Sequence, residues 1–98
     1  MSEEALRIDI WLWRARFFKT RAIATDYAAK GRIRIGTGDL VRRIEKPASQ
    51  VRPGDVLTFR LRSRIVSLKI ESLGERRGPA AEARELYTLT GEEDDRHV

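Results

Sequence analysis

Apolar residues near the start of the chain recur at helical spacing. Ile10, Trp13 and Phe17 lie three and four residues apart, which predicts one buried face of a helix of about ten residues. Asp9 is the expected N-cap of this helix, because its carboxylate can accept from the first free amides and suits the positive end of the helix dipole. Trp11 lies about 200° from Trp13 around a helix. The two indoles therefore cannot enter the same core.

A second helix is predicted directly after the first. Thr20 can cap it through its hydroxyl, and Gly31 supplies a left-handed stop. Its expected apolar face consists of Ile23, Ala24, Tyr27 and Ala28. The connection between the two helices must be short.

Alternation of apolar and polar residues then predicts strands. Residues 32–35 alternate arginine with isoleucine, so both isoleucines should be buried, and residues 40–44 are a weaker candidate for a second strand. The Pro-Gly-Asp turn at 53–55 precedes an antiparallel hairpin of residues 56–61 and 65–70. The buried side of its second strand is expected to consist of Val66, Leu68 and Ile70.

The last quarter of the chain predicts a short helix and a polar end. Pro79 suits the first turn of a helix that carries Ala83, Leu86 and Tyr87 on one side, although residues 87–89 could instead form a last strand. Beyond Gly91 no hydrophobic residue occurs until Val98, so residues 92–98 are expected to be a mobile acidic tail. Residues 1–91 are then one domain.

These elements define an α+β fold in which two N-terminal helices pack on a small, mainly antiparallel β-sheet, with a short C-terminal helix. A chain of 98 residues buries only about 60 to 65% of its unfolded surface, so the core is small. The absence of cysteine excludes disulfides, thiol nucleophiles and cysteine-based metal sites. No signal peptide or membrane-spanning run is recognisable, and a cytoplasmic protein is expected.

Positive charge is concentrated at the N-terminal end of the domain. Residues 7–35 contain eight lysines and arginines against two aspartates, a balance of plus six, whereas the whole chain carries plus five. The rest of the chain is therefore slightly acidic. Such concentration is the electrostatic pattern expected for a polyanion partner, although a solvated basic helix face would look similar.

The residues in this region also resemble a known family. The spacings Arg7-x-Asp9-x-x-Leu12, Thr20-Arg21-x-x-Ala24 and Gly31-x-Ile33-x-Ile35 are similar to the RNA-binding domain named after ribosomal small-subunit protein S4. The narrower strings RIDIWLW at 7–13 and ARFFKTR at 15–21 resemble one S4-like branch, the bacterial heat-shock protein 15 family. The resemblance covers residues 7–61 and continues weakly through RRGPAAEA at 76–83 and Leu86-Tyr87.

The resemblance implies a function. Members of this branch bind the large ribosomal subunit. The resemblance therefore implies an RNA-binding protein that contacts ribosomal RNA, transfer RNA or both, and aids rescue or recycling of stalled subunits carrying a nascent chain. A general structured-RNA binder, or an accessory subunit of an RNA-modifying enzyme, is the alternative. The chain departs from the family in a loop at 36–46, expected to be longer than the usual two-residue turn, and in lacking a long basic tail.

The expected RNA-binding residues all lie within this basic segment. They are Arg7, Trp11, Arg14, Arg16, Lys19, Thr20, Arg21, Lys30, Arg32 and Arg34. The sequence leaves open whether Arg7 contacts RNA or fixes Asp9, and whether Trp11 stacks on a base or packs in the core. Three further arginines at 60, 62 and 64 are more simply explained as edge charges that prevent sheet aggregation.

Catalysis is not expected. The enzymes that carry domains of this kind need a second domain, no cofactor loop is recognisable, and His97 has no partner at metal-ligand spacing. No cofactor, metal or membrane partner is predicted, and the free protein is expected to be a monomer. Binding is therefore the expected activity.

Overall fold

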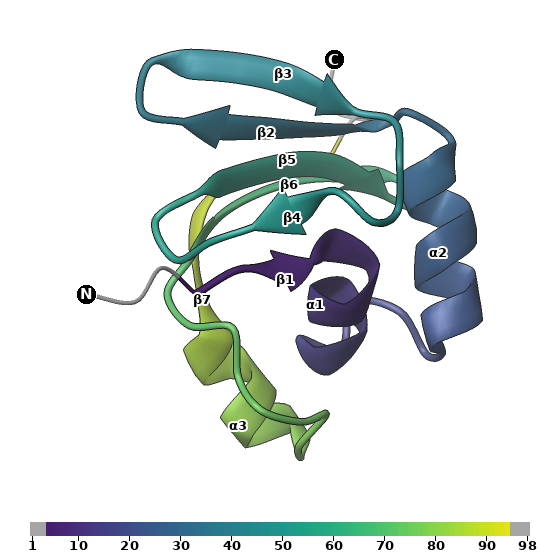
Figure 1. The fold of residues 1–98 in the computed structure, drawn as a ribbon, viewed down its shortest axis with the longest axis vertical. Helices are drawn as coiled ribbons and strands as arrows, with labels where there is room; N and C mark the ends of the chain where they lie inside the picture. The colour runs from purple at the N-terminus through teal and green to yellow at the C-terminus, as the bar shows by residue number, and fades with distance from the viewer. Residues whose placement is uncertain (1–3, 95–98) are drawn as a thin grey trace.

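A five-stranded antiparallel sheet covered on one side by two helices organises the chain (Figure 1). The computed structural model describes residues 4–94, of which 92–94 are described by their backbone only. The elements in chain order are β1 (Leu6–Arg7), α1 (Ile8–Arg14), α2 (Arg21–Ala29), β2 (Ile33–Thr37), β3 (Leu40–Ile44), β4 (Gln50–Val51), β5 (Val56–Leu61), β6 (Arg64–Ile70), α3 (Ala80–Ala83), the 3₁₀ turn η1 (Arg84–Leu86) and β7 (Tyr87–Asp94). The predicted α+β class is confirmed.

Within the sheet the strand order is β3-β2-β5-β6-β7, and every neighbouring pair is antiparallel. The predicted hairpin of β5 and β6 is present, and Leu57 lies opposite Leu68 on the buried face. Ile33 and Ile35 are buried as expected. The separate pair β1 and β4 has only two residues in each strand, which is too short for a sequence pattern to reveal.

The predicted long loop at 36–46 is wrong. Thr37 is directly opposite Leu40, so β2 and β3 form a hairpin with the two-residue turn Gly38-Asp39. Gly38 has φ +62°, and Asp39 does not share this positive φ. This is the glycine-first arrangement of a type II′ turn, which matches the twist of antiparallel strands. The usual Asn-Gly signal is therefore replaced by another two-residue turn.

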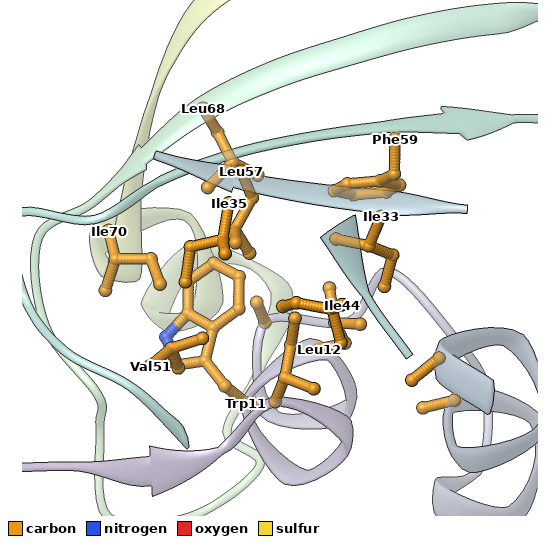
Figure 2. Close-up of a cluster of buried hydrophobic side chains, with 14 of the residues drawn as sticks. Trp11, Leu12, Ile33, Ile35, Ile44, Val51, Leu57, Phe59, Leu68 and Ile70 are labelled. Carbon is orange, nitrogen blue, oxygen red and sulfur yellow. The ribbon is translucent and has the colours of Figure 1, made fainter. Parts of the chain in front are cut away.

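Trp11 fills the centre of the core between α1 and the sheet (Figure 2). Its side chain is fully buried, and its Nε1 donates to the carbonyl oxygen of Ser72 at 3.0 Å. Trp13 is only partly buried and lies beneath the guanidinium of Arg77, 5.9 Å from the ring centroid. Trp13 was expected to be the more deeply buried of the two tryptophans, and the structure shows the reverse. The buried stripe of α1 consists of Ile8, Trp11, Leu12 and Ala15.

α1 begins two residues earlier than predicted, and Asp9 is not its cap. The N-cap is Arg7, which makes no side-chain capping bond, while Asp9 lies in the first turn and is fully buried. An aspartate in the first turn still suits the helix dipole. Its hydrogen-bond partners, however, are side chains outside the helix.

The end of α1 has the hydrogen bonds of a Schellman motif. The amide of Arg16 donates to the carbonyl of Trp13 at 3.1 Å, and the amide of Phe17 donates to the carbonyl of Leu12 at 3.0 Å. The left-handed position of this motif is usually glycine, yet here Arg16 occupies it with φ +67°. A side chain in this conformation costs about 1 kcal/mol.

α2 begins and ends as the sequence predicts. The Thr20 hydroxyl accepts from the amide of Ile23 at 3.1 Å, and Gly31 follows the helix with φ +70°. Ala24 and Ala28 are both buried. The hydroxyl of Tyr27 donates to the carbonyl of Arg60 at 2.6 Å, and this hydrogen bond connects α2 to β5. Ile23 is an exception, because it is 47% exposed.

The C-terminal region closes the core with one more strand. Pro79 was expected in the first turn of a helix and is instead the N-cap of α3. Tyr87 begins β7, so the strand alternative is confirmed there. The expected start of a mobile tail at residue 92 is wrong for residues 92–94, whose backbone pairs with residues 64–66 of β6. Edge pairing needs only backbone groups, which explains why a polar sequence can form it. Residues 95–98 of the predicted tail lie outside the described residues.

Candidate nucleic-acid interface

Five of the predicted RNA-binding cations are exposed in the segment that contains α2 and the start of β2. They are Lys19, Arg21, Lys30, Arg32 and Arg34. None of these five side chains has a hydrogen bond or ion pair with another residue in the range 4–94. We call this set the α2 basic surface. Two members precede or begin the helix and three follow it. The two ends of this nine-residue helix are about 14 Å apart.

The N-terminal end of α2 lacks the negative charge that usually compensates a helix dipole. Its first turn contains no acidic residue and starts with Arg21. Lys19 stands two residues earlier in the chain. A helix N-terminus carries about half a positive charge and is stabilised by anions, so cations there are unfavourable by typically 0.3–1 kcal/mol each. An RNA phosphate would remove this repulsion.

The outer side of the β2–β3 hairpin also carries cations that are not fully compensated by acidic residues. Arg34 and Arg43 are directly opposite each other, and both are exposed. Like charges in this position destabilise a strand pair. Glu45 compensates Arg43 only loosely, with 3.7 Å between Nη2 and Oε2. Sequence reasoning missed Arg43 because it did not predict the two-residue turn, and this turn sets the strand register that places Arg43 opposite Arg34.

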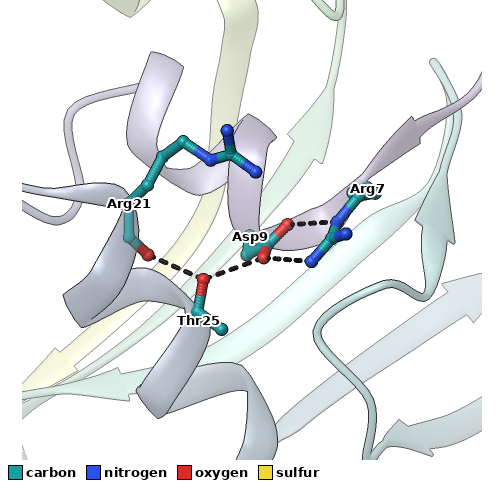
Figure 3. Close-up of polar contacts among 4 residues, drawn as sticks. All are labelled: Arg7, Asp9, Arg21 and Thr25. Atoms are coloured by element: carbon teal, nitrogen blue, oxygen red, sulfur yellow. Dashed lines mark hydrogen bonds and ion pairs between the residues drawn. The ribbon is translucent and has the colours of Figure 1, made fainter.

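A buried carboxylate fixes the position of α2 relative to α1 (Figure 3). Asp9 accepts from Arg7 Nε at 3.1 Å and Arg7 Nη2 at 2.8 Å, and from the Thr25 hydroxyl of α2 at 2.9 Å. The same hydroxyl lies 2.8 Å from the carbonyl oxygen of Arg21, so its single proton is shared between two acceptors. Arg7 therefore fixes Asp9, while its own side chain remains 44% exposed.

These contacts make the stability of the domain sensitive to acid. Burial by itself raises the pKa of Asp9, but the hydrogen bonds from Arg7 and Thr25 and the charge of Arg7 lower this pKa below its ordinary value. A lowered pKa in the folded state means that the unfolded chain binds more protons near pH 4. The contribution of Asp9 is thus present above about pH 4 and is lost as the pH falls through the folded-state pKa.

We therefore expect Asp9→Asn to lower the free energy of unfolding by about 1–3 kcal/mol at pH 7, because a neutral amide weakens the charge-assisted hydrogen bonds from Arg7 and the hydrogen bond from Thr25. The loss should shrink as the pH approaches 3. Urea unfolding at pH 7, 5 and 3 measures it, with Asp26→Asn on the exposed side of α2 as the control. An equal loss for Asp9→Asn at all three pH values would show that the carboxylate charge is not what matters.

Two of the predicted RNA contacts also form hydrogen bonds that hold the fold together. Arg14 Nη1 donates to the carbonyl oxygens of Leu73 at 3.4 Å and Gly74 at 2.8 Å. Arg16 Nε donates to the carbonyl oxygen of Gly78 at 2.7 Å. Both arginines thereby hold the segment before α3 against α1. Arg16 is still exposed, so the rest of its guanidinium remains accessible.

The two remaining predicted contacts are also accounted for. Trp11 cannot stack on an RNA base, because its ring is fully buried; the prediction for it is wrong. Thr20 is exposed, but its hydroxyl caps α2. Its contribution to the α2 basic surface is to hold the amides of the first turn in position.

This arrangement suits electrostatic binding of a polyanion. A rigid helix held by the Asp9 contacts presents fixed cations, which can neutralise phosphates and match the shape of a structured RNA. Among residues 4–94, no three histidine, cysteine, aspartate or glutamate side chains gather as a metal site. No helix within the same range is long and apolar enough to cross a membrane.

Comparison with known proteins places these features in a family. A model of the S4 domain matches residues 6–57. Heat shock protein 15 of Escherichia coli K12 is 34% identical over 87 residues, which cover 89% of this chain and 62% of that protein. The chain therefore spans less than two thirds of this relative. The RQC P-site tRNA stabilizing factor of Listeria monocytogenes is 36% identical over 88 residues, which cover 90% of this chain and 89% of that factor.

A solved structure supports the same relationship. The fold matches a structure described as trimeric heat shock protein 15 of Vibrio cholerae with a TM-score of 0.77 and 33% sequence identity, over 89% of this chain and 83% of that one. The match extends well past the S4 region, as the weak sequence resemblance around α3 predicted. The chain belongs to the S4 domain family, within the group formed by heat shock protein 15 and its homologues.

Proposed function

We propose that this protein binds the large ribosomal subunit, through ribosomal RNA, transfer RNA or both, and assists rescue or recycling of stalled subunits that carry a nascent chain. The observation that carries the proposal is the uncompensated charge of the α2 basic surface, above all Lys19 and Arg21 at a helix N-terminus without acids. The names of the relatives, one of which is a P-site tRNA stabilizing factor, support a ribosomal target.

In this proposal the protein acts by binding and performs no reaction. The exposed cations take up RNA phosphates, and the Asp9 contacts keep α2 in a fixed orientation, so that only an RNA of matching shape can meet all of them. Such a role places the protein where ribosomes are, in the cytoplasm. We also propose that the free protein is a monomer, unlike the trimer named for the Vibrio cholerae structure.

Sedimentation with purified ribosomal particles tests the proposal. The protein should sediment with large subunits, more strongly when these carry peptidyl-tRNA, and weakly with small subunits. The matched control is the variant Arg21→Glu/Lys30→Glu, which should stay in the supernatant. Equal binding to both subunits and to unrelated structured RNA would instead indicate a general RNA binder. Sedimentation velocity of the free protein gives its oligomeric state in the same experiment.

The acidic end of the chain should weaken RNA binding slightly. Changing Glu92 and Glu93 to Gln and Asp94 to Asn removes three negative charges and leaves the backbone pairing of β7 possible. We expect RNA affinity to rise, by less than about 1 kcal/mol because water and salt screen the repulsion. Titration at two salt concentrations should show the larger gain at low salt. Weaker binding at both concentrations would mean that these acids make favourable contacts.

A further inference from the structure

A pocket away from the α2 basic surface lies where the end of α1, the β5–β6 hairpin and α3 meet. Its volume is about 270 Å³. The residues that define its character are Arg16, Phe17, Leu61, Arg64, Arg84 and Tyr87. Small-molecule sites usually measure roughly 300–1,000 Å³, so this pocket lies just below the lower end of that range.

One part of the pocket is aromatic. The rings of Phe17 and Tyr87 lie 4.9 Å apart, and both side chains are partly buried against the core. Phe17 also meets Phe59 edge-on at 5.4 Å, and Tyr87 meets Trp11 edge-on at 6.3 Å. The two rings that line the pocket are therefore held rigidly, as a stacking surface for a base requires.

The other part of the pocket is cationic. Arg16 and Arg84 are exposed, and Arg84 has no side-chain partner among residues 4–94. Arg64 is already engaged in an interaction, and nothing below depends on it. Among residues 4–91, no acidic side chain lines the pocket. Within that range, an anion would meet guanidinium groups without a competing carboxylate from the lining.

Backbone strain is concentrated at the same place. Among residues 4–94, only Arg16 and Arg62 adopt positive φ without being glycine, at +67° and +60°. Arg16 lines the pocket, and Arg62 belongs to the two-residue turn between Leu61 and Arg64, which line it as well. Strain of this kind is retained mostly at functional sites. A glycine would relieve it at either position but would remove the cation.

We propose that this pocket binds one unpaired nucleotide of the RNA target, with its base against Phe17 and Tyr87 and its phosphate at Arg16 and Arg84. The combination of a rigid aromatic surface and planar guanidinium groups matches an exposed base with its phosphate. The proposal rests on the proposed RNA-binding function and adds a second point of contact. An RNA with an unstacked nucleotide near a helix would meet both sites.

Amide chemical shifts of the ¹⁵N-labelled full chain test this proposal. The probes are a hexaadenylate RNA, inorganic phosphate and a hexapeptide of glutamate, each titrated separately. Hexaadenylate should shift the amides of Phe17, Arg84 and Tyr87, whereas phosphate should shift only the arginines and bind more weakly. Arg84→Gln should weaken hexaadenylate binding about tenfold, the effect of one lost charge-assisted hydrogen bond.

The matched control is Arg52→Gln, which removes one exposed cation near the other end of β5 and should change the affinity less than twofold. Shifts confined to α2, with Arg84→Gln binding like the wild type, would overturn the pocket while leaving the proposed function intact. Tighter binding of the glutamate peptide than of hexaadenylate would make it a peptide site. Phosphate binding as tight as that of hexaadenylate would overturn base recognition. No RNA binding anywhere would contradict both proposals.

Discussion

Replacing Trp11 by alanine is expected to lower the free energy of unfolding by about 3–5 kcal/mol. The ring is fully buried between α1 and the sheet, and its Nε1 satisfies the carbonyl oxygen of Ser72. Small domains are stable by about 5–15 kcal/mol in total, so this variant should be close to unfolding at 37 °C. Thermal denaturation followed by circular dichroism should show a midpoint lower by more than about 12 °C.

Trp13→Ala is the matched control for this prediction. It removes the same side chain two residues later, from a partly buried position beneath Arg77, and should cost roughly 1 kcal/mol. Trp11→Phe should lie between the two, because it keeps an aromatic ring but loses the hydrogen bond. Equal midpoints for the two alanine variants would show that the buried face of α1 is assigned wrongly.

The reversed roles of these tryptophans show what helical spacing can determine. Ile8, Trp11, Leu12 and Ala15 follow a three-and-four pattern just as Ile10, Trp13 and Phe17 do, since this segment is apolar nearly all round. In such a segment periodicity predicts a helix but not which face is buried. Phe17 was also misleading as a guide to the face, because it lies beyond the end of α1 and its position is set by the Schellman turn.

Elements with strong local signals could be predicted from the sequence. The cap at Thr20, the left-handed Gly31, the isoleucines of β2 and the β5–β6 hairpin all depend on neighbouring residues, and all are confirmed. The β2–β3 turn was missed because Gly38 takes the place of the expected Asn-Gly signal. β7 continues past Gly91 because its pairing depends on backbone rather than on side chains.

Long-range contacts limited the prediction of the site. Charge correctly drew attention to residues 7–35, but Arg14 and Arg16 bond to carbonyl groups about 60 positions away in the sequence. Asp9 likewise depends on Thr25 of the next helix. A local pattern reveals that a residue is charged, whereas only the fold reveals which charges are already used. The five cations of the α2 basic surface are those left over.

Reversing Arg21 and Lys30 to glutamate is expected to reduce RNA affinity by about 100-fold or more, since each lost charge-assisted contact contributes about 1.5–3 kcal/mol. Both residues are exposed and without partners among the described residues, so stability should change by less than about 0.5 kcal/mol each. Filter binding or fluorescence anisotropy with a ribosomal RNA fragment measures the affinity. Circular dichroism verifies the fold.

The control for this pair is Arg52→Glu/Lys69→Glu, which changes net charge equally at exposed positions outside the α2 basic surface. It should lose far less affinity, because only the long-range attraction is reduced. An equal loss in both variants would mean that overall charge, and not this surface, determines RNA binding. The comparison thus separates a located interface from a general basic character.

The salt dependence of RNA binding tests the central claim most directly. For the wild-type protein, the logarithm of the affinity should fall linearly with the logarithm of salt concentration, by about 0.7–0.9 for each phosphate neutralised. Arg21→Gln/Lys30→Gln should reduce this slope by about 1.4–1.8, the contribution of two phosphates, while Arg52→Gln/Lys69→Gln should leave it nearly unchanged. Identical slopes for the wild type and Arg21→Gln/Lys30→Gln would contradict the assignment of the α2 basic surface as the RNA interface.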